Sequence, residues 1–342
     1  MPSDTMTIDE REHCRLKLEK AVKAVGDTIL SYEGSVRDVG DVMEHGHETS
    51  SLDEAARETM VKVLAGEFPD RDLTLLFELH PWEVKAMKPS GKGKLHFVID
   101  EIDGTTNAKR WAAATVKEYR PHSAVCIAGC TSTGLDSLEV GAVFTIDQGE
   151  LFSGLRIGRD FGRFSAYRNG DPLVIPPRKR GDSKNRILVV GYTSSVRVRK
   201  AQIEEEICSR EDFVVYDGCR SSTMDLISII RNQYDAYLDP RAVFGKDTET
   251  RLETYDVAGI LPAMYACNLE ISDIYGEPLT DYNWEDPLPL LVARPEISGE
   301  LLETVRKIVT RRNIIPSHSA WRTMLQAERA GRKKQRPKII GS

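Results

Sequence analysis

No stretch of the 342-residue sequence reaches the roughly 18 consecutive apolar residues that a membrane-spanning helix needs. The residues after Met1 also lack the basic and then apolar layout of a secretory signal. The six cysteines include no CxxC pair, so the sequence indicates neither a zinc ribbon nor a disulfide framework. We therefore expect a soluble, cytoplasmic protein with reduced cysteines and no membrane partner.

Excess positive charge is missing except at the C-terminal end. The formal net charge is −6, and residues 331–342 contain five Lys or Arg and no acidic residue. Because the rest of the chain is more acidic still, nucleic acid is disfavoured as the main partner. The basic end is typical of a solvated terminus, and a polyanion-binding arm is the alternative.

One stretch joins a buried-strand pattern to groups that bind metal and phosphate. Residues 95–99 are mostly apolar and predict a strand that ends in Asp100 and Asp103. Gly104 lets the chain turn at once, and the two threonines that follow can open a helix whose free amides favour phosphate. Two carboxylates across a tight turn suit a hard cation such as Mg²⁺. Taken alone, the motif also fits a calcium-like or merely solvated acidic turn.

Residues 100–107 resemble the first signature of the inositol monophosphatase superfamily, the metal-dependent sugar-phosphate phosphatases. Glu101 replaces the proline usual in that family, which puts an additional negative charge beside the metals. Residues 254–261 resemble the second signature, with Tyr255 in place of tryptophan. Both occur in the family's order and at its distance, and the resemblance spans roughly residues 7–315.

The resemblance implies an α/β fold of the layered αβαβα sandwich type. We expect an N-terminal α+β subdomain with the metal and phosphate site at 1–185, a C-terminal α/β subdomain at 186–315 and a basic tail at 316–342. The chain between 7 and 31 has the spacing of an amphipathic helix that covers a sheet. We also expect a homodimer.

The resemblance also gives roles to acids that lie far apart in the sequence. We expect the metal ligands to be Glu78, Asp100, the Ile102 carbonyl, Asp103 and Asp256. Glu83 is the alternative to Glu78, because the register of the segment between them is open. Asp53, at the start of a capped helix, pairs with Thr105 in the family to take a proton from the attacking water.

Further residues are expected to contact the substrate. The phosphate would bind Gly104, Thr105 and Thr106, and the rest of the substrate would meet Arg220, Ser221, Asp239 and Arg241. The last two resemble a segment of the archaeal-type members that act on inositol monophosphate and fructose 1,6-bisphosphate. An ion-paired turn is the alternative for them.

These residues predict a phosphoric monoester hydrolase that uses two or three Mg²⁺, with Mn²⁺ as a substitute, to activate water for direct attack. The expected substrate is inositol monophosphate, fructose 1,6-bisphosphate or both. The alternatives are a 3′(2′),5′-bisphosphate nucleotidase, a histidinol-phosphatase, and a catalytically weak relative that binds sugar phosphates.

Overall fold

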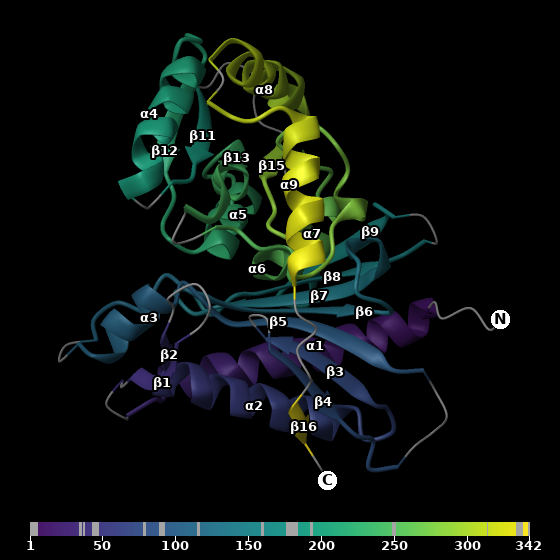
Figure 1. The fold of residues 1–342 in the computed structure, drawn as a ribbon. Helices are drawn as coiled ribbons and strands as arrows, with labels where there is room; N and C mark the ends of the chain where they lie inside the picture. The colour runs from purple at the N-terminus through teal and green to yellow at the C-terminus, as the bar shows by residue number, and fades with distance from the viewer. Residues whose placement is uncertain are drawn as a thin grey trace.

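The computed structural model describes residues 6–33, 36, 38–42, 48–77, 80–88, 93–114, 117–158, 161–175, 184–191, 194–247, 251–312, 314–332 and 338–340. Within these residues, layers of helices alternate with two main β-sheets (Figure 1). None of the helices in these ranges is long and apolar enough to cross a membrane.

Two long helices, α1 (Ile8–Leu30) and α2 (Ser51–Glu67), cover the outer face of the larger sheet (Figure 1). Each begins at a hydroxyl cap, because the side chains of Thr7 and Ser50 accept hydrogen bonds from amides three residues ahead. Leu18, Val22 and other apolar side chains of α1 are buried against the sheet. The amphipathic helix predicted from the sequence is therefore confirmed.

The larger sheet has the order β10-β9-β8-β7-β6-β5-β3-β4-β16. Its strands are β3 (Leu73–Phe77), β4 (His80–Val84), β5 (Leu95–Asp103), β6 (Ala124–Cys130), β7 (Leu138–Thr145), β8 (Leu151–Arg156), β9 (Phe164–Arg168), β10 (Asp171–Pro172) and β16 (Lys338–Ile340). β3 and β5 are parallel, and β5 to β10 form an antiparallel meander. Strand β5 therefore lies inside the sheet with paired neighbours on both sides. A separate hairpin joins β1 (Asp38–Val42) to β2 (Glu48–Ser50).

The smaller sheet has the order β12-β11-β13-β15-β14. Its strands are β11 (Asn185–Val189), β12 (Phe213–Asp217), β13 (Ala236–Asp239), β14 (Glu270–Asp273) and β15 (Leu290–Ala293). β11 is parallel to both β12 and β13, and α4 (Ser194–Cys208) and α5 (Ser222–Ile230) connect these strands. Their carboxyl ends therefore meet at one edge, where parallel sheets commonly bind ligands.

Three short elements fill the space between the sheets: α5, α6 (Thr254–Ala258) and α7 (Leu261–Ala266) (Figure 1). One hydrophobic core includes side chains from both sheets and from these helices. On the far side of the smaller sheet lie α4 and α8 (Pro295–Lys307). The predicted αβαβα sandwich is confirmed. The other helical elements are helix α3 (Thr105–Ala112), 3₁₀ turns at Leu135–Ser137, Arg241–Asp247 and Leu279–Asp281, and a π-helical turn at Ile308–Arg312.

Glycines let α6 and α7 lie directly on the backbone of the larger sheet. A Cβ added to Gly141 would lie 2.3 Å from the carbonyl oxygen of Gly259, and one added to Gly154 would lie 2.7 Å from the nitrogen of Ala263. A Cβ on Gly259 would lie 2.8 Å from the nitrogen of Ile127. The small residues after Asp256 thus allow these helices to pack closely on the sheet.

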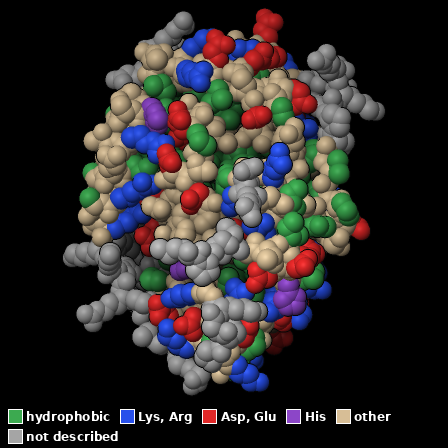
Figure 2. All heavy atoms as spheres, turned by 90° about the vertical axis from the view of Figure 1, so that its right-hand side faces the viewer, with side chains coloured by type: hydrophobic (Ala, Val, Ile, Leu, Met, Phe, Trp, Pro, Cys, Tyr) green, Lys and Arg blue, Asp and Glu red, His purple; other side chains and the backbone are tan. Residues whose placement is uncertain are grey.

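The segment 316–342, which we expected to be a basic tail, contains helix α9 (His318–Gly331). Trp321 and Leu325, one turn apart, are buried in the core formed with the smaller sheet. Strand β16 follows and pairs with β4. The expectation rested on the count of charges and overlooked these two apolar residues. On the face shown in Figure 2, acidic and basic side chains are interspersed.

Candidate active site

The loop after β5 has the conformation that its sequence predicts. The pairing of β5 with β6 is irregular between Asp100 and Asp103, and Gly104 then adopts a left-handed φ of 84°. A Cβ at Gly104 would lie 3.0 Å from the Cβ of Ser221, so a larger residue would be both strained and crowded. Helix α3 begins at the next residue, so its N-terminal amides directly follow the loop that carries the two aspartates.

Asp103 joins this loop to the second half of the chain. Its Oδ2 accepts hydrogen bonds from the Ser221 hydroxyl at 2.9 Å and from the Thr223 amide at 2.5 Å. Ser221 is also the N-cap of α5. Burial raises the pKa of Asp103, and the hydrogen bonds from Thr223 and Ser221 oppose that rise. Asp103 and Ser221, which lie 118 positions apart in the sequence, are therefore in direct contact.

Asp256 lies at the same junction. The Thr223 hydroxyl donates to the Asp256 carbonyl at 2.9 Å, and Asp256 Oδ2 accepts from the Glu253 amide at 2.8 Å. Burial raises the pKa of Asp256 well above its ordinary value, and the negative charge of Asp103 raises it further. The two carboxylates are close enough to repel each other.

Cys126 shows that Asp100 belongs to the same cluster. It is the direct partner of Asp100 on the neighbouring strand β6, and its Sγ lies 3.2 Å from the Thr223 hydroxyl. Burial, and then the charges of Asp100, Asp103 and Asp256, raise the pKa of this thiol. The thiol therefore stays protonated at neutral pH and is a poor nucleophile.

Asp53 lies beside helix α3, which Thr105 begins, but no hydrogen bond joins these two described side chains. Asp53 Oδ2 accepts from the amide and hydroxyl of Ser50 at 2.8 and 2.7 Å. It also lies 3.9 Å from Nζ of Lys109 on α3. The Thr105 hydroxyl donates to the Ile102 carbonyl at 2.8 Å. Each group thus has a structural role in this conformation.

Glu101, expected to add a negative charge beside the metals, is paired with an arginine. Its Oε1 accepts from Nε and Nη2 of Arg57 on α2 at 3.0 and 2.6 Å, and only 2% of the residue is exposed. The guanidinium also lies 5.5 Å from the ring centre of Phe77. The Glu101 carboxylate therefore forms its ion pair with α2.

Glu78 and Glu83 are the two candidates for the first metal ligand. Glu78 lies outside the described residues. Glu83 lies on β4 and pairs with Lys94 at 2.8 Å and with Lys85 at 3.8 Å. Its carboxylate is thus already balanced by two lysines, one directly after β4 and one directly before β5.

Asp239 and Arg241 form a buried ion pair. Nε and Nη2 of Arg241 lie 2.9 and 2.6 Å from the Asp239 carboxylate, which also accepts from Tyr237 Oη at 3.0 Å. The alternative of an ion-paired turn describes this geometry. Arg241 still lies beside the site, because its Nη2 is 3.4 Å from the Ser222 hydroxyl and its charge opposes the raised pKa of Asp256.

A pocket of about 510 Å³ opens at the carboxyl ends of β11 and β12. It is lined by Gly191, Arg197, Lys200, Glu204, Asp217, Gly218 and Arg220. Lys200 pairs with both Glu204 and Asp217, which raise its pKa although burial alone would lower it. A Cβ at Gly191 would lie 2.6 Å from the Lys200 stem, so glycine leaves room for the lysine.

Sequence reasoning identified Arg220 but missed the rest of this pocket. A usable signal was present, because Arg197, Lys200 and Glu204 are spaced to lie on one side of α4. Arg220 itself has a left-handed φ of 67°, which is uncommon for a residue with a side chain. It immediately precedes Ser221, which binds Asp103.

The donor set fits a hard divalent cation. Asp100, Asp103 and Asp256 offer only carboxylate oxygens at one junction. Asp100 and Asp103 are buried there and Asp256 is half-buried, and their mutual repulsion favours a bound cation. Among the described residues, however, no three His, Cys, Asp or Glu side chains are already arranged around a metal position. Hydrogen bonds from the Thr223 and Glu253 amides hold one oxygen of Asp103 and one of Asp256.

Comparison with known proteins agrees with this geometry. The model of the inositol monophosphatase family matches residues 11–310. A Thermotoga maritima inositol monophosphatase has a TM-score of 0.61 at 16% identity, covering 86% of this chain and 97% of its own. The extragenic suppressor protein suhB of Bartonella henselae has a TM-score of 0.62 at 15% identity, covering 85% and 98%.

A third solved structure is described as an inositol monophosphatase–fructose 1,6-bisphosphatase. It has a TM-score of 0.58 at 16% identity and covers 87% of this chain and 100% of its own. At such identities these structures show the fold alone. Comparison with curated proteins found no match.

Proposed function

The chain belongs to the inositol monophosphatase family, and we propose that it is a metal-dependent phosphatase that hydrolyses a small phosphate monoester. The observation that carries this proposal is the meeting of Asp100, Asp103 and Asp256 beside the first turn of α3. Anionic substrate and clustered carboxylates repel each other, so cations must lie between them.

The metal site would be formed by Asp100, Asp103 and Asp256, with Glu78 and the Ile102 carbonyl as further ligands. Members of this family generally use Mg²⁺, and we propose two or three ions, with Mn²⁺ as a substitute. When bound, they would neutralise the phosphate and lower the pKa of water. The raised pKa of Cys126 supports attack by water rather than by this thiol.

The chain's own groups would bind the phosphate and handle the proton. The amides from Gly104 to Thr106 are the free donors at the start of α3, whose dipole also favours an anion. Thr105 would pass the proton of the attacking water to Asp53, which Lys109 brings toward α3. That relay requires the Thr105 hydroxyl to leave the Ile102 carbonyl that it now contacts.

The pocket at the ends of β11 and β12 favours a substrate with a second anionic group. We call it the basic pocket, because its lining has three basic side chains, Arg197, Lys200 and Arg220, and two acidic ones. The loop between β12 and α5 separates this pocket from the phosphate site and contacts both. Ser221 binds Asp103, Asn107 of α3 donates to the Cys219 carbonyl at 3.2 Å, and Arg220 lines the pocket. Of the two expected substrates, fructose 1,6-bisphosphate therefore fits better than inositol monophosphate.

Matched substrate pairs test this assignment. We expect phosphate release with Mg²⁺ and a higher kcat/KM for fructose 1,6-bisphosphate than for fructose 1-phosphate, which lacks only the distal phosphate. Adenosine 3′,5′-bisphosphate and adenosine 3′-phosphate form the nucleotide pair, and histidinol phosphate and inositol monophosphate complete the panel. Release from none of these esters would support the catalytically weak relative instead.

Variants of two arginines on α4 distinguish binding in the pocket from a general effect of charge. Arg197→Gln should reduce the preference for the bisphosphate, because Arg197 lines the pocket. Arg199→Gln is the control, since Arg199 instead lies over the ring of Phe244 at 5.1 Å. If Arg197→Gln kept the same preference for the bisphosphate, the pocket would not be part of the substrate site. The homodimer and the cytoplasmic location stay predictions.

A further inference from the structure

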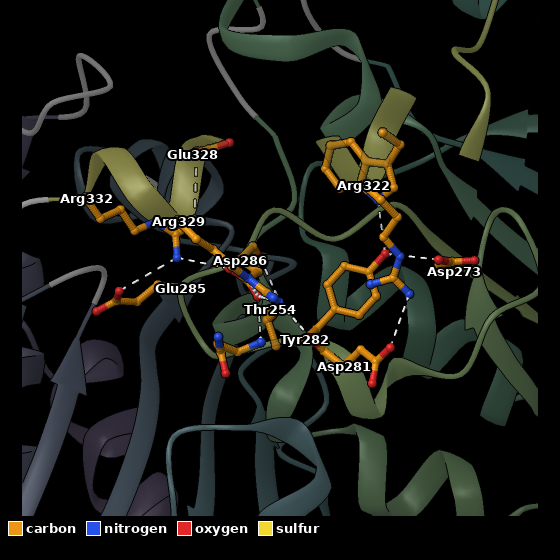
Figure 3. A network of polar contacts seen from close by, with 12 residues as sticks. Thr254, Asp273, Asp281, Tyr282, Glu285, Asp286, Arg322, Glu328, Arg329 and Arg332 are labelled. Atoms are coloured by element: carbon orange, nitrogen blue, oxygen red, sulfur yellow. Dashed lines mark hydrogen bonds and ion pairs between the residues drawn. The ribbon is translucent and has the colours of Figure 1, made fainter. Parts of the chain in front are cut away.

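Helix α9 lies after the last residue that the family model matches, and its Arg329 and its C-cap residue Arg332 reach a buried acid (Figure 3). Nε of Arg329 lies 3.1 and 3.0 Å from the two carboxylate oxygens of Asp286, and Nη1 of Arg332 lies 3.1 Å from one of them. Asp286 has an exposed fraction of 0%. Because a buried carboxylate needs partners, these contacts fix the Asp286 segment to α9.

Asp286 in turn holds the first residue of α6. Its carbonyl accepts from both the amide and the hydroxyl of Thr254, at 3.0 and 2.9 Å (Figure 3). A β-bridge between Glu253 and Pro287 runs alongside. Asp256 lies two residues after Thr254 in the same single-turn helix. The backbone that carries the proposed metal ligand is therefore tied to the backbone that α9 holds.

A second connection runs from α9 to Asp256 through Arg251. This arginine pairs with Glu328 of α9 and, at 2.5 Å, with Glu253. The amide of Glu253 donates to the Asp256 carboxylate at 2.8 Å. Two separate chains of polar contacts thus connect α9 to Asp256, and both act on the start of α6.

We propose that α9 is a positioning element that fixes Asp256 against Asp103 before metal binds. Arg329 and Arg332 act through Asp286, and Glu328 acts through Arg251. They are positioning residues, because none of them touches the aspartate cluster itself. The inference rests on the proposed metal-binding role of Asp256.

The attachment of α9 to the core does not depend on these arginines. Trp321, in the first turn of α9, is 1% exposed, and its Nε1 donates to Tyr282 Oη at 3.2 Å. Leu325 is also buried. Deleting the helix would expose this apolar surface and destabilise the whole protein. Side-chain variants at the C-terminal half of α9 are therefore the sharper probe.

The test compares two variants of the full chain. Arg329→Ala/Arg332→Ala removes both contacts to Asp286. Arg322→Ala is the matched control, because Arg322 lies on the same helix but contacts the Asp281 side chain at 3.4 Å and the Tyr282 ring at 5.5 Å. The first readout is amide hydrogen exchange of residues 252–258 in the metal-free protein. The second is the Mg²⁺ dependence of phosphate release.

In the double variant we expect exchange of residues 252–258 to become faster and the half-saturating Mg²⁺ concentration to rise by about 10-fold, the usual effect of losing support for a metal ligand. The control should keep both values. Arg329→Lys/Arg332→Lys should recover part of the loss, because lysine retains the charge without the bidentate geometry.

Unchanged exchange of residues 252–258 in the double variant, with faster exchange of residues 326–331, would overturn the proposal and leave α9 as a cover. Equal losses in the control would also overturn it, since they would reflect general stability. If the double variant does not fold, Arg332→Ala alone carries the same comparison. The exchange readout needs no turnover, so failure of the proposed function would be seen separately, as absent phosphate release.

Discussion

Arg57 and Glu101 form an ion pair beside the aspartate cluster, with Nε and Nη2 of the arginine 3.0 and 2.6 Å from one carboxylate oxygen. Arg57 lies one turn after Asp53 on α2, and Glu101 directly follows Asp100 on β5. The pair therefore holds two parts of the site at a fixed distance. Burial raises the pKa of Glu101, and the charge of Arg57 opposes that rise.

Arg57→Ala should lower the free energy of unfolding by about 3 kcal/mol, because it leaves Glu101 buried without its partner. Glu101→Gln should cost less, since it removes the charge and keeps the shape. The control is Lys94→Ala, which breaks the half-exposed pair with Glu83 and should cost less than about 1 kcal/mol. Urea unfolding of the metal-free proteins measures all three. A loss in Arg57→Ala no larger than the control would contradict the prediction.

The sequence predicts those features of the site that depend on neighbouring residues. The strand ending at Asp103, the turn at Gly104 and the helix after it follow from residues next to one another. The ion pair of Arg57 with Glu101 joins residues 44 positions apart, and no spacing rule predicts it. Without a known family to compare, Asp103 and Ser221 would also have stayed unconnected.

Three other features were not predicted from the sequence, each for a physical reason. The segment of helix α9 was predicted to be a tail because it is rich in charged residues. Trp321 and Leu325 nevertheless have the spacing of a buried helical face. The basic pocket depends on how α4 crosses the ends of two parallel strands, which is a property of the fold. The additional charge of Glu101 was predicted, but the sequence does not show that its side chain pairs with Arg57 of α2.

Asp256→Asn should abolish phosphate release and raise the stability of the metal-free protein. The folded pKa of Asp256 is raised well above its ordinary value by burial and by Asp103, so ionising it opposes folding. The stabilisation by asparagine should shrink as falling pH protonates Asp256 in the wild type. Thermal unfolding in the presence of a chelator from pH 7.5 downward checks the sign. Near-normal turnover in moderate Mg²⁺ would mean that the ligand is wrongly assigned.

Asp100→Asn should likewise remove activity without unfolding the protein. Asp100 is buried next to Asp103, and its side chain accepts the Ile102 amide at 3.1 Å, a contact that the asparagine carbonyl can keep. Circular dichroism and phosphate release on one sample test both halves of the statement. Retained activity would exclude Asp100 from the metal site.

Asp147 should give the protein an acid-sensitive component of stability. Burial raises its pKa, but hydrogen bonds from His122 and Arg231 outweigh this and lower the pKa to about 2. Because the folded pKa is below the ordinary value of 3.8, the contribution is present above that value and lost as the pH falls toward 2. The stability difference between wild type and Asp147→Asn should therefore be constant above about pH 5 and shrink below it. A difference independent of pH would contradict the assignment.

Thr105 separates a group that moves a proton from one that supports the turn. Its hydroxyl donates to the Ile102 carbonyl at 2.8 Å, and Asp53, its expected partner, is held by Ser50. If the hydroxyl exchanges partners during turnover, Thr105→Ala should lower kcat by ~10²-fold or more with little change in the half-saturating Mg²⁺ concentration. Thr105→Ser should keep much of the rate. Thr310→Ala is the control, because the exposed Thr310 hydroxyl also donates to a backbone carbonyl, that of Arg306 at 2.9 Å, but lies outside the site.

The competing expectation starts from the contact that the structure contains. If the Thr105 hydroxyl only supports the turn by binding Ile102, alanine should cost about 1 kcal/mol of stability and leave the rate per folded molecule almost unchanged. Because the Ile102 carbonyl is also a proposed metal ligand, freeing it could only make it more available to the cation. A normal rate with a lowered melting temperature, measured on one Thr105→Ala sample, would therefore exclude the relay. It would leave Asp53 with the capping role that its contacts to Ser50 already describe.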